Sequence, residues 1–438
     1  MTSGNDRGRT MPGAAWLLAT LAILGNPFGA SALADEAAAT GSTLLLRKAT
    51  VYTMAPGATE PLKDTDVFIE NGRIAAIGRG LAAPAGTPVV EAAGRALTPG
   101  IFGGLSHVGL QEIGLEQTTG DYAQRLGQMR PEFDVTLAFN PESMSLGVHR
   151  SNGVTFAMLT PASASGGSIV AGLGAPAGLD GSAPASARAL FVDLGGDAND
   201  LSGGSRAAQF MLLRQALVEA RAPNLVMVHD ERLLTPSGRQ VLLDFLKGNG
   251  LFVFDVDRAS DIRNTLALAR DEKLRAAIRG GTEAWRVADE LAAAGVPVIL
   301  DPLDNLPDSF DGLGATLQNA AKLRTAGVTV LISIGDTDVD DAGKTRQAAG
   351  NAVAHGMPWM DALAAITRAP AEVFGVADRF GSLERGKPAD LVLWSGDPLE
   401  VTSLPELVVA SGRQQSLASR HTALRDRHYE RVRAGAAR

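Results

Sequence analysis

Short apolar segments alternate with longer helical segments through the middle of this chain, and this alternation limits the possible folds more than any other feature. Strands that alternate with helices form parallel sheets, so we expect an α/β fold. Eight repeats over about 280 residues match a (β/α)8 TIM barrel, whose active sites lie at the carboxyl ends of the strands. An open doubly wound sheet is the alternative. The expected strands are residues 101–107, 154–160, 189–194, 224–229, 251–256, 274–279, 296–301 and 328–334.

The segments before and after this region have a different sequence pattern, which is typical of short strands and turns. In the first segment, Asn71-Gly72 favours a type I′ hairpin turn. We therefore predict a small composite β-sandwich made from residues 35–98 and 378–415, with the barrel at 99–377. The charge-rich tail, residues 416–438, is expected to form a surface helix. The glycine-rich segment 166–181 is expected to be a long loop over the barrel mouth.

The start of the chain is typical of a secretory signal peptide. Arg7 and Arg9 precede an apolar core, and residues 32–34 match a small-x-small cleavage site. Cleavage after residue 34 predicts an exported, periplasmic protein with no stable membrane span, whereas an uncleaved anchored start is the alternative. The formal net charge is −8, and removing Asp6, Arg7 and Arg9 takes away a net +1, which leaves −9.

Composition excludes several kinds of site. The chain has no cysteine, so disulfides, thiolate metal ligands and a cysteine nucleophile are impossible. A net negative chain without a basic stripe is a poor partner for nucleic acid. No G-x-S-x-G elbow is present for a serine nucleophile. A catalytic metal would need His, Asp, Glu or a modified Lys.

Two motifs point to a known family. Residues 97–109 read L-T-P-G-I-F-G-G-L-S-H-V-G, which resembles the opening barrel strand of the amidohydrolase superfamily, P-G-L-I-D-x-H-x-H. Residues 365–391 resemble the C-terminal signature of that superfamily, T-x-N-P-A-x-x-L-G followed by G-S-L-x-x-G-K-x-A-D-L. The chain is similar over nearly its whole mature length to an imidazolonepropionase-like member. The resemblance implies a hydrolase of carbon–nitrogen bonds in small cyclic amides.

The same resemblance implies one or two divalent metal ions, held by a first-strand H-x-H, a carboxylated Lys or Glu after strand four, histidines after strands five and six, and an Asp after strand eight. Alternate residues of a strand face the same side, so H-x-H delivers two imidazoles to one metal. In this chain Gly103 and Leu105 stand in place of Asp and His, and only His107 remains. Asp255 occupies the strand-five position. With Asp257 it forms a carboxylate pair, or both pair with Arg258 or neighbouring basic side chains.

The remaining family positions are mixed. Gly280 stands where the strand-six histidine is expected, and Asp336 matches the metal-binding, proton-transferring Asp after strand eight. After strand four, His229 and Glu231 offer side chains but no lysine. Asp336 is therefore the candidate catalytic residue, although capping a helix or loop is another common role for Asp. We treat His229 and Glu231 as possible additional residues of the barrel mouth.

Two functions of different classes follow. The first is a hydrolase of small cyclic amides that uses zinc, iron or manganese held by His107, Asp255 and Asp336. The second is a non-catalytic barrel that binds a small-molecule ligand, or stabilises a metal-competent amidohydrolase partner. An unrelated barrel with another acid–base pair is a third reading. A homodimer, or a dimer with an amidohydrolase relative, is expected for barrels of this kind.

Overall fold

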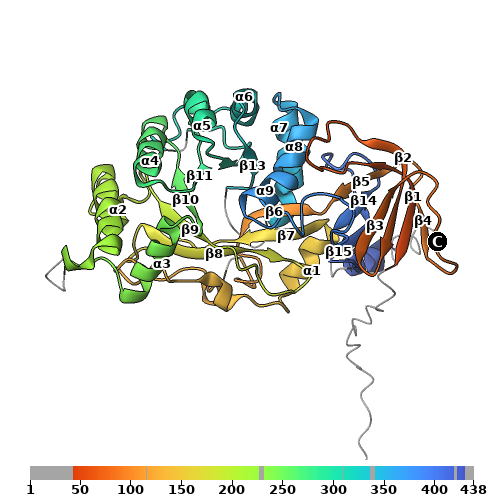
Figure 1. Cartoon of the computed structure of the whole chain (residues 1–438), viewed down its shortest axis with the longest axis horizontal. Helices are drawn as coiled ribbons and strands as arrows, with labels where there is room; N and C mark the ends of the chain where they lie inside the picture. The colour runs from red at the N-terminus through yellow and green to blue at the C-terminus, as the bar shows by residue number, and fades with distance from the viewer. Residues whose placement is uncertain are drawn as a thin grey trace, which may run out of the picture. The chain divides into compact units, whose positions relative to one another are not determined.

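A computed structural model describes residues 43–114, 116–225, 231–307, 309–335, 341–418 and 422–429. The expected signal, residues 1–34, lies outside these ranges. The described chain folds into an eight-stranded barrel sheet with surrounding helices and a second eight-stranded sheet (Figure 1). The expected fold class, an α/β barrel with a separate β domain, is confirmed. Within the described residues, no helix is both long and apolar enough to cross a membrane.

The second sheet is built from both flanks of the chain. Strand β5 pairs in parallel with β1 on one side and antiparallel with β14 on the other, so N-terminal and C-terminal strands lie side by side (Figure 1). The expected hairpin joins β2 to β3, and Asn71 and Gly72 both have the positive φ that a type I′ turn needs. The strands are β1 Leu44–Val51, β2 Leu62–Glu70, β3 Arg73–Gly78, β4 Val89–Glu91, β5 Ala96–Pro99, β14 Leu391–Trp394, β15 Pro405–Ala410 and β16 Arg413–Gln414.

The barrel sheet runs in the order β13-β12-β11-β10-β9-β8-β7-β6. Helices follow its later strands, as a β/α repeat requires, and strands β9 to β13 are parallel. The strands are β6 Ile101–Ser106, β7 Val154–Leu159, β8 Val170–Gly178, β9 Ala189–Asp193, β10 Leu251–Val256, β11 Ala276–Gly280, β12 Val298–Leu300 and β13 Val330–Ile332. The helices are α1 Met144–Ser151, α2 Arg206–Arg221, α3 Pro236–Leu246, α4 Ala259–Glu272, α5 Ala288–Ala294, α6 Asn319–Thr325, α7 Thr345–Ala354, α8 Trp359–Ala365 and α9 Arg368–Val373.

The expectation of a loop at residues 166–181 is wrong, because this segment contains β8. The strand is buried along its whole length and runs antiparallel between β7 and β9. Its glycines allow backbone contacts that a side chain would block: a Cβ on Gly174 would lie 2.0 Å from the carbonyl oxygen of Leu159, and one on Gly172 would lie 2.5 Å from that of Phe133. The glycine-rich composition of this segment, which is typical of loops, therefore belongs to a closely packed strand.

The strand expected at residues 224–229 is not found where the structure describes this segment. Residues Pro223–Leu225 form a short 3-10 helix, and 226–230 lie outside the described residues. Strand β9 pairs directly with β10 instead. Together with β8, this gives eight barrel strands by a different route from the one that the sequence pattern predicts.

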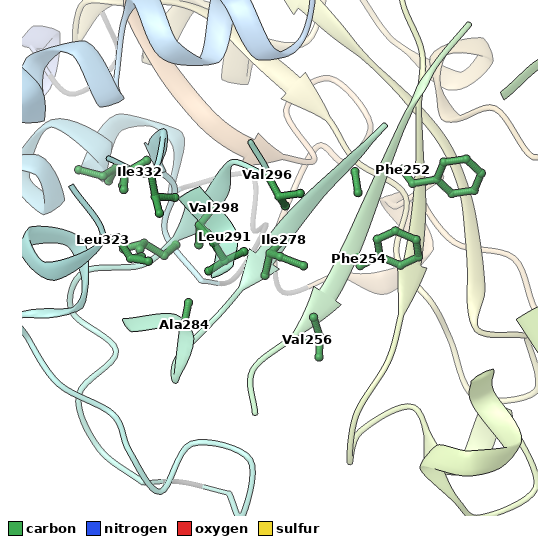
Figure 2. Close-up of a cluster of buried hydrophobic side chains, with 14 of the residues drawn as sticks. Phe252, Phe254, Val256, Ile278, Ala284, Leu291, Val296, Val298, Leu323 and Ile332 are labelled. Carbon is green, nitrogen blue, oxygen red and sulfur yellow. The ribbon is translucent and has the colours of Figure 1, made fainter. Parts of the chain in front are cut away.

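The outer face of the later strands carries the main core. Phe252, Phe254 and Val256 of β10 point away from the barrel interior and join Ile278 of β11 in one apolar cluster (Figure 2). Leu291 of α5, in the same cluster, belongs to the helical layer over this face. Alternation with period two explains the pattern, since every second side chain of a strand faces the helices and the others face the barrel interior.

A polar bridge joins the barrel to the second sheet. The hydroxyl of Thr155 in β7 donates a 2.6 Å hydrogen bond to Oδ2 of Asp390, directly before β14. A Cβ on Gly100 would lie 2.0 Å from that hydroxyl and 2.4 Å from that carboxylate oxygen. The glycine after Pro99 and the aspartate of the C-terminal A-D-L signature are therefore parts of the same contact.

Candidate active site at the barrel mouth

Charged side chains collect at the carboxyl ends of the barrel strands because of the same period-two alternation. On β10, Leu251 and Val253 face the barrel interior, and Asp255 is the next residue on that face. On β11, Ala277 faces inward and Arg279 follows it. The barrel interior is filled by apolar side chains, so the first polar residue on the inward-facing side of each strand marks the barrel mouth.

Three charged residues are lateral neighbours across three strands. Asp255 is opposite Asp193 of β9 on one side and opposite Arg279 of β11 on the other. Nη1 of Arg279 lies 3.3 Å from Oδ2 of Asp255, with 19% and 32% of the two side chains exposed. We expect these carboxylates to pair with Arg258 or with neighbouring basic side chains, and Arg279 is such a neighbour of Asp255. Arg258 itself is engaged elsewhere, because its Nε and Nη2 contact Asp261.

These residues line a cavity of about 380 Å³. Its wall combines carboxylates with apolar side chains from five strand ends and the loops that follow them. The residues are Leu105, Asp255, Asp257, Arg279, Gly280, Ile299, Leu300, Asp301, Asp304, Ser333, Ile334, Gly335 and Asp341. A larger hollow of about 690 Å³ lies outside the barrel near Trp285 and Lys322. The strand ends contribute nothing to it, so the mouth is the candidate active site.

Asp257 belongs to a hydrogen-bonded group with Thr282 and Asp304. Its Oδ1 accepts a 3.0 Å bond from the backbone N–H of Thr282 and lies 2.7 Å from the hydroxyl of that residue. The same hydroxyl lies 2.8 Å from Oδ2 of Asp304. A hydroxyl has one hydrogen and can donate it to only one carboxylate. Both contacts are hydrogen bonds at the same time only when one of the two carboxyl groups is protonated and donates to the hydroxyl oxygen.

Both aspartates at the end of β10 titrate near neutral pH. Burial raises the pKa of Asp255 to about 6. The positive charge of Arg279 lowers this pKa, and the negative charge of Asp193 raises it further. Burial also raises the pKa of Asp257 to about 6, and the neighbouring charge of Asp255 adds to the rise. A carboxyl group in this range can give or take a proton at working pH.

His107 lies just beyond β6 and is buried, with 5% of its surface exposed. Its ring stacks on Tyr122, with 3.6 Å between ring centroids and 8° between planes. Burial, together with the charge of Arg279, lowers the pKa of His107 to about 3, so the imidazole is neutral. A neutral imidazole is the form that binds metal, but this residue is not part of the cavity wall.

The positions around His107 and Asp255 do not fit the metal centre that the family resemblance implies. Leu105 is an apolar wall residue, buried at 4% exposure. Gly280 has φ +76°, and a Cβ there would lie 2.6 Å from Oδ1 of Asp257 and 3.2 Å from Oδ1 of Asp255. The carboxylate of Asp257 thus occupies space that the Cβ of a histidine at this position would need. Among the described residues, no group of three or more His, Asp or Glu side chains is placed to hold a metal ion.

The structure describes only one of the three other expected site residues. Asp336 and His229 lie outside the described residues. Glu231 is exposed, and its backbone carbonyl accepts a long 3.4 Å bond from Gln215. It is not part of the mouth cavity.

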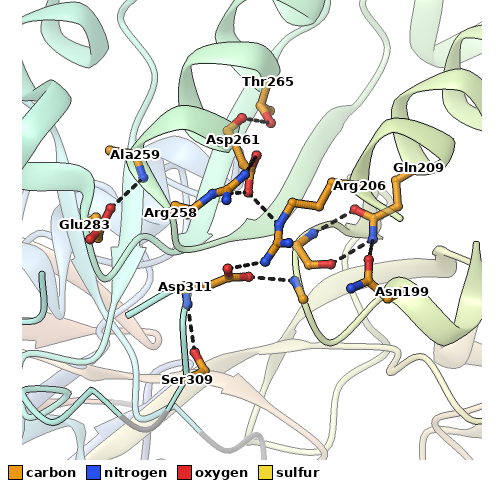
Figure 3. Close-up of polar contacts among 12 residues, drawn as sticks. Asn199, Arg206, Gln209, Arg258, Ala259, Asp261, Thr265, Glu283, Ser309 and Asp311 are labelled. Carbon is orange, nitrogen blue, oxygen red and sulfur yellow. Dashed lines mark hydrogen bonds and ion pairs between the residues drawn. The ribbon is translucent and has the colours of Figure 1, made fainter. Parts of the chain in front are cut away.

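The loops above the mouth are tied together by an ionic network (Figure 3). Arg206, at the start of α2, pairs with the buried Asp261 of α4 at 3.1 Å and with Asp311 of the loop after β12. The carboxylate of Asp311 also accepts a 2.6 Å bond from the backbone N–H of Gly196, after β9. Loops that follow β9, β10 and β12 are therefore fixed to one another.

The sequence pattern missed the role of Arg279, although a signal for it existed. Alternation on β11 places residue 279 on the inner face, two positions after the inward-facing Ala277. The family motif has its histidine at the position of Gly280, so it does not point to the residue before it. Thr282 and Asp304 carried no signal, because their contact joins two loops that are distant in the sequence.

Comparisons with known proteins agree with this fold. The family model described as "Amidohydrolase family" matches residues 263–417. The amidohydrolase tasK of Hapsidospora irregularis is 36% identical over 84 residues, which is 19% of this chain and 9% of that protein. A dihydroorotase of Geobacter sulfurreducens is 45% identical over 73 residues, which is 17% of this chain and 16% of that protein. The aligned segments thus span less than a fifth of these two relatives.

Solved structures match over a larger part of the chain. An amidohydrolase from Thermotoga maritima MSB8 has a TM-score of 0.75 and 26% identity, and the match covers 85% of this chain and 99% of that one. Molinate hydrolase has a TM-score of 0.52 and 16% identity, with 86% and 95% of the two chains covered, and shares the fold alone. The narrower resemblance to imidazolonepropionase stays a prediction.

Proposed function

Because this chain belongs to the amidohydrolase superfamily, we propose that it hydrolyses a carbon–nitrogen bond of a small cyclic amide at the barrel mouth, with aspartates as acid and base. The observation that carries this proposal is the pair formed by Asp255 and Asp257. Both line one cavity, both have a pKa raised to about 6, and an arginine adjoins the first. A carboxyl group in a cleft whose pKa is raised by burial and a charged neighbour is a candidate for a functional site.

The two carboxyl groups have different neighbours, which divides the roles between them. Arg279 favours the ionised form of Asp255, so this carboxylate is the general base that takes a proton from water. The water oxygen attacks the amide carbonyl carbon. Asp257, which shares the hydroxyl of Thr282 with Asp304, is the general acid. It protonates the amide nitrogen as the C–N bond breaks, which leaves a carboxylic acid and an amine on the opened ring.

No step is assigned to a divalent metal, because the mouth side chains that the structure describes do not form the expected donor set. Leu105 cannot ligate, and Gly280 cannot carry a side chain without displacing Asp257. His107 keeps one imidazole near the mouth but stacks on Tyr122. The zinc, iron or manganese that the resemblance implies therefore stays a prediction that these residues do not support.

A hydrolysis assay tests this proposal. Lactams, cyclic imides and hydantoins are incubated with protein that has been dialysed against a chelator, and ring-opened products are measured by mass spectrometry. We expect turnover by the wild type, and a fall of about 10²- to 10⁴-fold in Asp257→Asn, the usual contribution of a general acid. Asp271→Asn is the matched control, because that carboxylate is exposed on α4. The proposal fails if no ring is opened, or if Asp257→Asn keeps full activity.

The second candidate is a non-catalytic barrel that binds a ligand or stabilises a metal-competent amidohydrolase partner. Leu105 and Gly280 favour it, since both replace residues with which the superfamily binds metal. An inactive wild type whose melting temperature still rises with a cyclic amide would support ligand binding. Co-elution with a relative that has the full ligand set would support the partner role, and a homodimer would appear as a doubled mass.

Export to the periplasm also stays part of the proposal. The apolar segment near the start of the chain and the small residues at 32–34 support it. Mass spectrometry of the protein from a periplasmic extract would give a mature N-terminus at Asp35. An intact N-terminus in the membrane fraction would favour the anchored alternative.

A further inference from the structure

Arg279 brings a positive charge to the position where the barrel strands converge on the mouth. Its neighbours across the sheet are Asp255 on the adjacent strand and Asp193 one strand further. The ion pair with Asp255 measures 3.3 Å, and 19% of the arginine side chain is exposed. The guanidinium therefore sits in the cavity wall with restricted access to water, where its field is screened less than on an open surface.

The residues next to Arg279 at the mouth are held in place by backbone and side-chain contacts. Gly280 has a positive φ, so the residue after Arg279 contributes backbone only. Asp257 occupies the space above that glycine, and Thr282 fixes it with two hydrogen bonds. Leu105 closes the side of the mouth formed by β6.

The guanidinium can also contact a substrate. An arginine has five N–H donors, and a single ion pair with one carboxylate oxygen uses at most two of them. Arg279 and Asp255 line the same cavity. A carbonyl oxygen bound in this cavity can therefore accept a hydrogen bond from the cation while Asp255 holds the attacking water. In metal-dependent hydrolases, a bound metal ion supplies the positive charge that polarises the carbonyl.

We propose that the guanidinium of Arg279 is a permanent cation that replaces the divalent metal of the superfamily, and that it binds the carbonyl oxygen of the substrate. The second half of this proposal rests on the proposed hydrolysis. The first half does not, because it concerns only which cation the carboxylates of the mouth hold. An arginine keeps its charge at every physiological pH, so the site needs no metal supply.

A metal titration without substrate tests the replacement. Isothermal titration with Zn²⁺ and with Mn²⁺ compares the wild type with Arg279→Met, Arg279→Lys and the double variant Asp255→Asn/Arg279→Met. Arg270→Met is the control for removing an arginine, since that side chain is 77% exposed. We expect Arg279→Met to bind the ions roughly 10- to 100-fold more tightly than the wild type, because a like charge a few ångströms away is lost at an effective dielectric constant of about 20.

The other variants fix the interpretation. Arg279→Lys should resemble the wild type because it keeps the charge, and the double variant should lose the gain because the carboxylate is gone. Arg279→Gln, which keeps hydrogen-bond donors, replaces the Met variant if circular dichroism shows that Arg279→Met is not folded. Tight stoichiometric binding by the wild type overturns the proposal, as does an unchanged affinity in a folded neutral variant. Failure to open any ring leaves this titration unaffected, so the two proposals can be told apart.

Discussion

The hydroxyl oxygen of Ser333 accepts a 2.9 Å hydrogen bond from the backbone N–H of Leu105. Strands β6 and β13 are the two ends of the barrel sheet, and no backbone ladder joins them in the described structure. This side chain therefore connects the sheet ends at the mouth. It also fixes the backbone at Leu105, where the superfamily has a metal ligand.

Replacing Ser333 with Ala should destabilise the protein. The N–H of Leu105 would lose its partner in a buried site, which costs about 1 to 3 kcal/mol of unfolding free energy. Urea denaturation measures the change, and Ser260→Ala on the exposed side of α4 is the control. A loss no larger than that of the control would mean that the barrel closes without this bond.

Replacing Gly280 with Ala should cost more than the same change at Gly295. Both glycines have positive φ, and an alanine there costs about 1 to 2 kcal/mol through backbone strain alone. At Gly295 no atom lies within 4 Å of the added Cβ, whereas at Gly280 the Cβ would lie 2.6 Å from Asp257. The difference between the two unfolding free energies isolates the steric part. Equal losses would show that Asp257 does not occupy this space.

Asp390→Asn should stabilise the protein above neutral pH. Burial raises the pKa of Asp390 from 3.8 to about 7. Between these values the folded chain keeps a proton that the unfolded chain has lost, so stability falls as pH rises and the full penalty is reached above pH 7. An asparagine carries no charge and avoids this penalty.

The expected gain from Asp390→Asn is up to a few kcal/mol at pH 8 and close to zero near pH 4. Denaturant unfolding at a series of pH values measures it, with Asp271→Asn as the exposed control. A gain that is the same at both pH values would contradict the raised pKa.

Removing the side chain of Asp311 should loosen the loop after β12. The Asp311→Ala change takes away the 2.6 Å bond from Gly196 and the ion pair with Arg206. Amide hydrogen exchange should become faster at Gly196 and in the loop, with little change in the barrel strands, because local opening is governed by local contacts. Faster exchange throughout the chain would show that the network supports global stability instead.

Much of the fold is predictable from the sequence, because apolar alternation marks buried strands wherever side chains are large. Strand β10 is an example, since Phe252 and Phe254 alternate with Val253. Strand β8 escaped prediction for a physical reason. Gly172 and Gly174 are needed for close backbone contacts, and that composition is also typical of loops.

The site was only partly predictable. Asp255 was found because alternation and the family motif place it at the same strand end. Arg279 was not assigned a role, since the motif supplies a histidine at the next position and says nothing of a cation. The partners of Asp257 depend on how two loops meet, which local sequence does not specify.

The metal content of the wild-type protein tests the central claim most directly. The wild type and His107→Ala are each dialysed against Zn²⁺ and Mn²⁺ and then against metal-free buffer. Elemental mass spectrometry then measures the bound metal in both proteins. The arrangement of Arg279 with Asp255 predicts a substoichiometric amount of metal, with the same value in the variant. One or more equivalents that disappear in His107→Ala would contradict it.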